Sequence, residues 1–104
     1  MKKKIDGQLL KLLLDFIKEN EIDINSSEVD MSTKLIGSNS IFDSIELVSF
    51  IVETEQFIDD NYDIQVQLAS ESAMSRRRSP FISLNSLKEY IIELSDEQNY
   101  FNYR

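Results

Sequence analysis

The stretch IFDSIELVSFIVETEQFI, residues 41–58, carries the clearest helical pattern in the chain. Its apolar residues recur three and four positions apart, as they do on the buried face of an amphipathic helix. Asp43 is a favoured N-cap residue, and Glu46 follows it at the spacing of a capping box. We therefore predict a helix that starts at Asp43 or Ser44.

This helix should have two distinct faces and end at about Asp59 or Asp60. The inward face is apolar apart from one threonine and comprises Leu47, Phe50, Ile51, Thr54, Phe57 and Ile58. The outward face is polar and mainly acidic and comprises Glu46, Ser49, Glu53 and Gln56, with Glu55 and Asp59 at its flanks. A helix of this kind covers a core on one side and faces water or a partner on the other.

Two further helices are expected, one on each side of this helix. The first should run from Ile5 to about Asn20, and its apolar stripe comprises Leu9, Leu10, Leu13, Phe16 and Ile17. The last should begin after Ser83, a good N-cap residue, and reach about Ser95. Its apolar stripe comprises Leu84, Leu87, Tyr90, Ile91 and Leu94.

The two connections between these helices differ in character. Residues 21–42 show no hydrophobic period, so we predict a long, partly ordered loop of a length that often carries function. Its apolar residues, which should attach it to the core, are Leu35, Ile36, Ile41 and Phe42. Residues 67–80 could form one or two irregular helical turns before Pro80.

These elements define an all-α fold. We predict a small bundle of three main helices, with a possible short helix before the last one and a long loop between the first two. A chain of 104 residues has the size of a single domain. We expect a helical core over about residues 5–95 and a C-terminal tail over residues 96–104.

The composition restricts the surroundings and the partners of the chain. It contains no cysteine, which fits a reducing compartment. Its net charge of −8 opposes binding to nucleic acid or to anionic membranes, and favours proteins with basic docking surfaces. The apolar stretch behind Lys2, Lys3 and Lys4 is interrupted by charges and is too short to cross a bilayer. We expect a cytoplasmic protein.

The missing residue types also argue against catalysis by this chain alone. Without histidine there is no Ser-His or Cys-His pair and no imidazole base. Without histidine and cysteine the common zinc sites are excluded as well. We therefore predict a non-catalytic protein without a metal site, on which other enzymes act.

Ser44 allows two interpretations. The first is that Asp43 and Ser44 only start a helix, and on local grounds this accounts for the sequence DSIE. The second is that Ser44 is modified, because a hydroxyl at an exposed helix start lies near free backbone N–H groups and the positive end of the helix dipole. A phosphate ester is favoured there. Since the chain has no catalytic base, another enzyme would have to attach it.

The chain resembles the acyl carrier protein family over about residues 5–95. FDSIELVSFIVETEQ is similar to the family's Asp-Ser-Leu motif and the acidic second helix that follows it. SLNSLKEYI resembles the start of the family's last helix, and MSTKLIGSNSIFDS fits its long first loop. The chain departs from the family in Ile41, where glycine is common, in Ile45, which replaces leucine, and in a longer segment that contains Arg76, Arg77 and Arg78.

The resemblance implies a specific modification. Ser44 would carry 4'-phosphopantetheine, which a phosphopantetheinyl transferase attaches from coenzyme A, and Asp43 would help that enzyme to recognise the site. Acyl or aminoacyl groups would be bound to the arm as thioesters. The residues that would meet partner enzymes on the second helix are Glu46, Ser49, Val52, Glu53, Glu55 and Gln56.

The resemblance also implies the kind of partner. These would be acyl- or aminoacyl-activating ligases and acyltransferase-type enzymes, and the carrier itself would be a monomer. The chain also resembles divergent carriers that occur beside adenylating ligases in specialised or surface-polysaccharide pathways. We predict an acyl carrier. The alternatives are an aminoacyl or peptidyl carrier of the same fold and an unmodified helical adaptor that binds proteins through its acidic second helix.

Overall fold

The protein is described by a computed structural model, which covers residues 2–37, 40–68 and 79–102. Within these ranges the regular structure is helical and no strand is present. This confirms the predicted all-α class. The elements are α1 (Lys2–Glu19), the 3₁₀ turn η1 (Ser26–Glu28), α2 (Ser44–Tyr62) and α4 (Leu84–Asn102).

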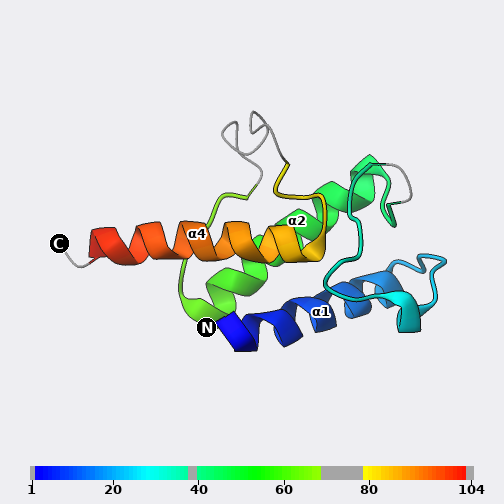
Figure 1. The fold of residues 1–104 in the computed structure, drawn as a ribbon, viewed down its shortest axis with the longest axis horizontal. Coiled ribbons are helices and arrows are strands. Elements are labelled where there is room, and N and C mark those ends of the chain that lie inside the picture. Colours follow the sequence, from blue (N-terminus) through cyan, green and yellow to red (C-terminus); the bar gives the residue numbers. More distant parts are fainter. Residues whose placement is uncertain (1, 38–39, 69–78, 103–104) are drawn as a thin grey trace.

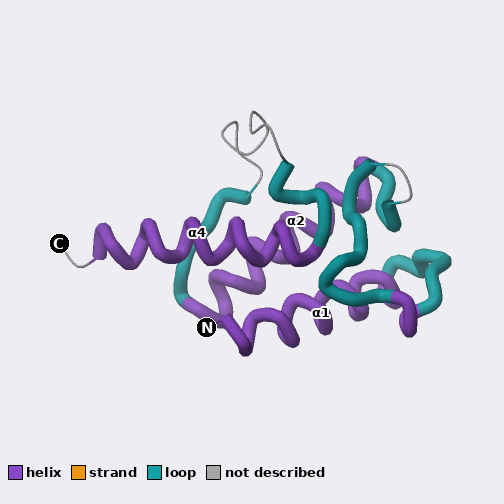
Figure 2. Tube along the Cα trace, viewed as in Figure 1, coloured by secondary structure: helices purple, strands orange, loops and turns teal. Residues whose placement is uncertain are grey.

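The helix α1 holds the molecule together, because it contacts both α2 and α4. Figure 1 shows α2 crossing behind α4 at an angle, with α1 beneath them and running in the opposite direction to α2. The long loop between α1 and α2 appears in teal in Figure 2, and it connects these helices at one end of the molecule. The predicted short helix within residues 67–80 falls mainly on residues 69–78, which lie outside the described residues, as do the three arginines.

The predicted inward faces form the core. On α2, Phe50, Ile51, Thr54 and Ile58 are buried, while Leu47 and Phe57 are half-buried at its edge. The buried hydroxyl of Thr54 donates to the carbonyl of Phe50 at 2.8 Å, which satisfies it without a partner from another element. The buried stripes of α1 and α4 comprise Leu9, Leu13, Phe16, Ile17, Leu84, Leu87, Tyr90 and Ile91.

Helix α2 is slightly longer than the sequence predicts, since it continues to Tyr62. The residue that ends it is Asp63, whose left-handed backbone (φ 55°) returns its N–H to the carbonyl of Asp59 at 3.0 Å. The Tyr62 hydroxyl donates to Gln8 of α1, and burial raises the pKa of this hydroxyl. The last turn of α2 therefore also attaches α2 to α1.

Helix α4 begins as predicted but ends later. The Ser83 hydroxyl accepts from the N–H of Ser86 at 3.2 Å, which confirms Ser83 as its N-cap. The expected end near Ser95 is wrong, because the backbone is helical through Asn102. Residues 96–102 contain neither proline nor glycine, so the sequence supplies no stop signal there.

The loop between α1 and α2 is fixed to the start of α4 by backbone hydrogen bonds. The first two N–H groups of α4, from Leu84 and Asn85, donate to the carbonyls of Thr33 at 3.2 Å and Met31 at 2.7 Å. Loop carbonyls thus serve donors that a helix cannot satisfy by itself. As predicted, apolar side chains attach this loop to the core: Leu35 and Phe42 are buried, and Ile36 and Ile41 are partly buried and pack against the core.

Candidate functional site

The start of α2 places Ser44 on the surface, immediately after the N-cap. The Asp43 carboxylate accepts from the N–H of Glu46 at 2.7 Å, and the Glu46 carboxylate accepts from the N–H of Asp43 at 3.0 Å. These two bonds form the predicted capping box. The capping of α2 is therefore carried by Asp43 and Glu46, and the exposed hydroxyl of Ser44 takes no part in either bond.

An aromatic cluster fixes the chain just before this site. The buried ring of Phe42 lies 5.4 Å from the ring of Phe16 on α1 and 5.4 Å from the ring of Phe50 on α2, measured between centroids. These separations are typical of favourable aromatic pairs. The Ser40 hydroxyl also donates to the Phe42 carbonyl at 3.2 Å. Ser44 thus follows within two residues of an anchor that ties the loop to two helices.

The electrostatics at Ser44 contain opposing contributions. The first turn of α2 offers N–H groups without intrahelical acceptors and the positive end of the helix dipole, both of which favour an anion. Asp43 and Glu46 place two carboxylates beside this end, where the first accepts the N–H of Glu46 and the second accepts the N–H of the N-cap residue Asp43.

The outer face of α2 differs from the predicted one. It carries an apolar row, here called the outer stripe, formed by Ile45 (78% exposed), Val48 (56%) and Val52 (56%). These residues are three and four positions apart, so they form one continuous row along the helix. The sequence predicts a polar, mainly acidic outside, and of the three stripe residues only Val52 is among the predicted partner-binding residues. A signal for Ile45 and Val48 is present in the sequence: they are spaced three and four positions from each other and from Val52, and none of the three belongs to the inward face.

The acidic residues expected to meet partners have different surroundings. Glu53 is exposed, as are Ser49 and Gln56. Glu46 is half-buried and engaged in the capping box, and Glu55 is half-buried and accepts the N–H of Leu68 at 2.7 Å. Two of the three glutamates therefore have structural roles, and Glu55 holds the segment after α2 against the helix.

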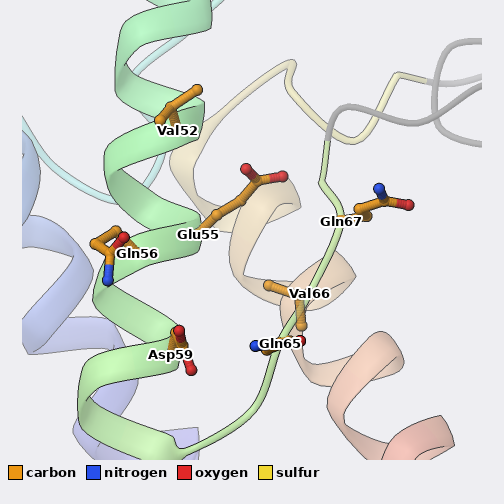
Figure 3. A pocket seen from close by; sticks show the side chains of 7 residues that line it. All are labelled: Val52, Glu55, Gln56, Asp59, Gln65, Val66 and Gln67. Carbon is orange, nitrogen blue, oxygen red and sulfur yellow. The ribbon is translucent and has the colours of Figure 1, made fainter.

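This segment and α2 enclose a groove of about 620 Å³, here called the α2 groove (Figure 3). Apart from two valines, the described residues that line it are polar. In Figure 3 the Glu55 carboxylate extends from α2 toward the segment that bears Gln65 and Gln67. The lining residues are Val52, Glu55, Gln56, Asp59, Gln65, Val66 and Gln67.

A second, smaller hollow of about 340 Å³ lies between α1 and α2. Leu12, Phe16 and Phe57 contribute its apolar lining, and Glu53 is one of the carboxylates around it. Gln56 lines both spaces, so α2 separates the two. The predicted partner residues are consequently divided, with Val52 and Glu55 on the groove side and Glu53 on the α1 side.

The described residues form neither a metal-binding cluster nor a membrane-spanning helix. Among the residues that the structure describes, no group of three or more Asp, Glu, His or Cys side chains is arranged to hold a metal ion. None of the helices in the described ranges is long and apolar enough to cross a membrane.

No known family model matches the chain, and comparisons with curated proteins and with solved structures find no match.

Proposed function

We propose that this chain is a carrier protein that holds an acyl or aminoacyl group as a thioester on 4'-phosphopantetheine attached to Ser44. The observation that carries the proposal is the division of roles at the start of α2. Asp43 and Glu46 complete the helix cap, while Ser44 presents a hydroxyl to solvent directly beside them. Capping therefore explains Asp43 without explaining Ser44.

The surroundings of Ser44 fit such a group. Its hydroxyl is exposed, and the anchored Phe42 fixes the backbone before it, so a transferase meets a defined surface. In the attachment step a bond forms between the Ser44 oxygen and the phosphorus of coenzyme A that carries the pantetheine arm. The bond from that phosphorus to adenosine 3',5'-bisphosphate breaks, and the hydroxyl proton passes to a base of the transferase. The bound group supplies a thiol, a function that this cysteine-free chain lacks.

The outer stripe supports the proposal by offering a docking surface next to the modified residue. Ile45 adjoins Ser44 directly, and Val48 and Val52 continue the row. Exposed apolar rows with a polar surround are typical of protein interaction sites. We expect the transferase, activating ligases and acyltransferase-type enzymes to cover this row with apolar side chains and to place basic residues near Glu53. These encounters would take place in the cytoplasm.

The second candidate function is an unmodified helical adaptor. The complete capping box favours it, since the box accounts for Asp43 and Glu46 without any modification. The outer stripe would then bind a partner by itself. The two functions differ in their dependence on Ser44, because an adaptor needs the stripe and not the hydroxyl.

Labelling with a fluorescent coenzyme A analogue separates the two. The folded chain is incubated with the analogue, magnesium and a broad-specificity phosphopantetheinyl transferase, and covalent fluorescence is read on a denaturing gel. A carrier should be labelled, and Ser44→Ala should abolish the label while the matched variant Ser49→Ala retains it. Absence of label with several transferases would favour the adaptor.

A further inference from the structure

We infer that the α2 groove receives the cargo end of the arm, and that this cargo bears a cationic amine, as an aminoacyl thioester does. The inference rests on the proposed function, because only a group attached at Ser44 would bring a cargo along α2. It chooses between the acyl and aminoacyl alternatives, which the sequence leaves open.

Helix geometry places Ser44 and most of the groove residues of α2 on the same side of the helix. With 3.6 residues per turn, Val48 lies about 40° around α2 from Ser44, Glu55 about 20° and Asp59 about 60°. Val52, at about 80°, completes a strip on the same side of the helix. A chain attached to Ser44 can therefore run along α2 past two exposed valines and arrive at the α2 groove without crossing to another face.

The length of the arm agrees with this path. A rise of 1.5 Å per residue places Glu55 about 16 Å and Asp59 about 22 Å along the axis from Ser44. The arm, from its phosphate to its sulfur, has the length of about five residues of extended chain, or about 17 Å. Its thioester would thus lie near Glu55, and a short cargo would extend toward Asp59.

The chemistry of the groove selects the cargo. Two carboxylates, from Glu55 and Asp59, lie one helical turn apart on its α2 wall, and among the described residues that line the groove there is no lysine or arginine. Amides of three glutamines add further polar groups. An ammonium group gains charge-assisted hydrogen bonds in such a place. An alkyl chain would instead remove water from carboxylates and amides without replacing their hydrogen bonds, which is unfavourable.

The test compares two arms that differ in one group. Stable amide analogues of the arm that end in alanyl or in isobutyryl are attached to Ser44, so an ammonium in one replaces a methyl in the other. Backbone amide shifts are then measured by NMR. We expect the alanyl arm to shift the amides of residues 55–59 and 65–67, and the isobutyryl arm to shift them less than half as much.

Variants identify the groups responsible. Asp59→Asn should remove at least half of the alanyl-specific shifts at residues 65–67. Glu55→Gln should do the same, and because a glutamine oxygen can still accept the N–H of Leu68, the segment should stay in place. The matched control is Glu53→Gln, which removes a carboxylate from α2 on the side away from the groove and should leave these shifts unchanged.

The outcomes are distinguishable. Equal shifts from the two arms, or larger shifts from isobutyryl, would overturn the inference while leaving the carrier function intact. Alanyl-specific shifts that survive both Asp59→Asn and Glu55→Gln would overturn it as well. Failure of Ser44 to accept either arm would overturn the proposed function, and the inference with it.

Discussion

Neighbouring residues at the start of α2 have separate tasks. Asp43 accepts the N–H of Glu46 at 2.7 Å and thereby caps the helix, whereas Ser44 contributes its hydroxyl only to the surface. The pair DS therefore combines a stabilising residue with one that is free to serve function. This division makes the two side chains separable by mutation.

Asp43→Ala should lower the free energy of unfolding by about 1 kcal/mol, because it removes the N-cap acceptor. Ser44→Ala should change it by less than about 0.5 kcal/mol, since the hydroxyl lies outside the cap. Urea denaturation of both variants beside the unmodified chain measures this difference. A loss from Ser44→Ala as large as that from Asp43→Ala would assign the hydroxyl to the cap and weaken the case for modification.

Phe42 is a second single residue on which stability depends, in this case through packing. Its ring is buried between Phe16 and Phe50, so Phe42→Ala leaves a cavity and should cost about 3–5 kcal/mol of unfolding free energy. Phe42→Leu retains most of the volume and should cost less than half as much. Thermal unfolding of the two variants tests the order. Equal stability of Phe42→Ala and the unmodified chain would show that this ring does not anchor the loop.

At the scale of the element, α2 presents an inner face that forms part of the core and an outer stripe that has no partner among the described residues.

Local signals sufficed to predict the cap, the inner face and the start of α4, because each depends on residues within a few positions. They did not identify Ile45 and Val48 as exposed, since the side of an apolar helix that stays uncovered depends on where α1 and α4 lie. The α2 groove was missed for the same reason, because residues 65–67 return against α2 only in three dimensions.

Val48→Ser tests the outer stripe as a docking surface. Val48 is 56% exposed, so the change should alter the unfolding free energy by no more than about 0.5 kcal/mol. It should nevertheless slow transfer of phosphopantetheine to Ser44, which initial rates of labelling measure. Glu89→Ser, at an exposed position of α4 outside the predicted partner-binding residues, is the control. An unchanged rate for Val48→Ser would remove the stripe from the transferase interface.

At the scale of the whole molecule, α1 joins α2 and α4 through polar contacts as well as through the core. Asp6 of α1 pairs with Lys88 of α4 at 3.3 Å, with the Lys88 side chain 19% exposed, and Gln8 accepts the hydroxyl of Tyr62 from α2. Both contacts lie near the start of α1, away from Ser44. The end of the molecule that bears the candidate site is held instead by the aromatic cluster and by the loop bonds to α4.

Lys88→Met should lower the unfolding free energy by about 1 kcal/mol, because it leaves the Asp6 carboxylate partly buried without a cation. The loss should shrink in high salt, which screens the pair in the unmodified chain. Denaturation at low and high ionic strength measures both effects. Lys11→Met, which removes a far more exposed pair with Asp15, should cost less. A smaller loss from Lys88→Met than from Lys11→Met would contradict this assignment.

The central claim is that Ser44 carries phosphopantetheine, and mass measurement tests it most directly. The folded chain is incubated with coenzyme A, magnesium and a phosphopantetheinyl transferase, its intact mass is measured, and the modified peptide is fragmented. We predict a gain of one phosphopantetheine on residue 44, and no gain for Ser44→Ala. No gain by the folded, unmodified chain with several transferases, or a gain at another serine, would contradict the claim and leave DSIE as a helix cap alone.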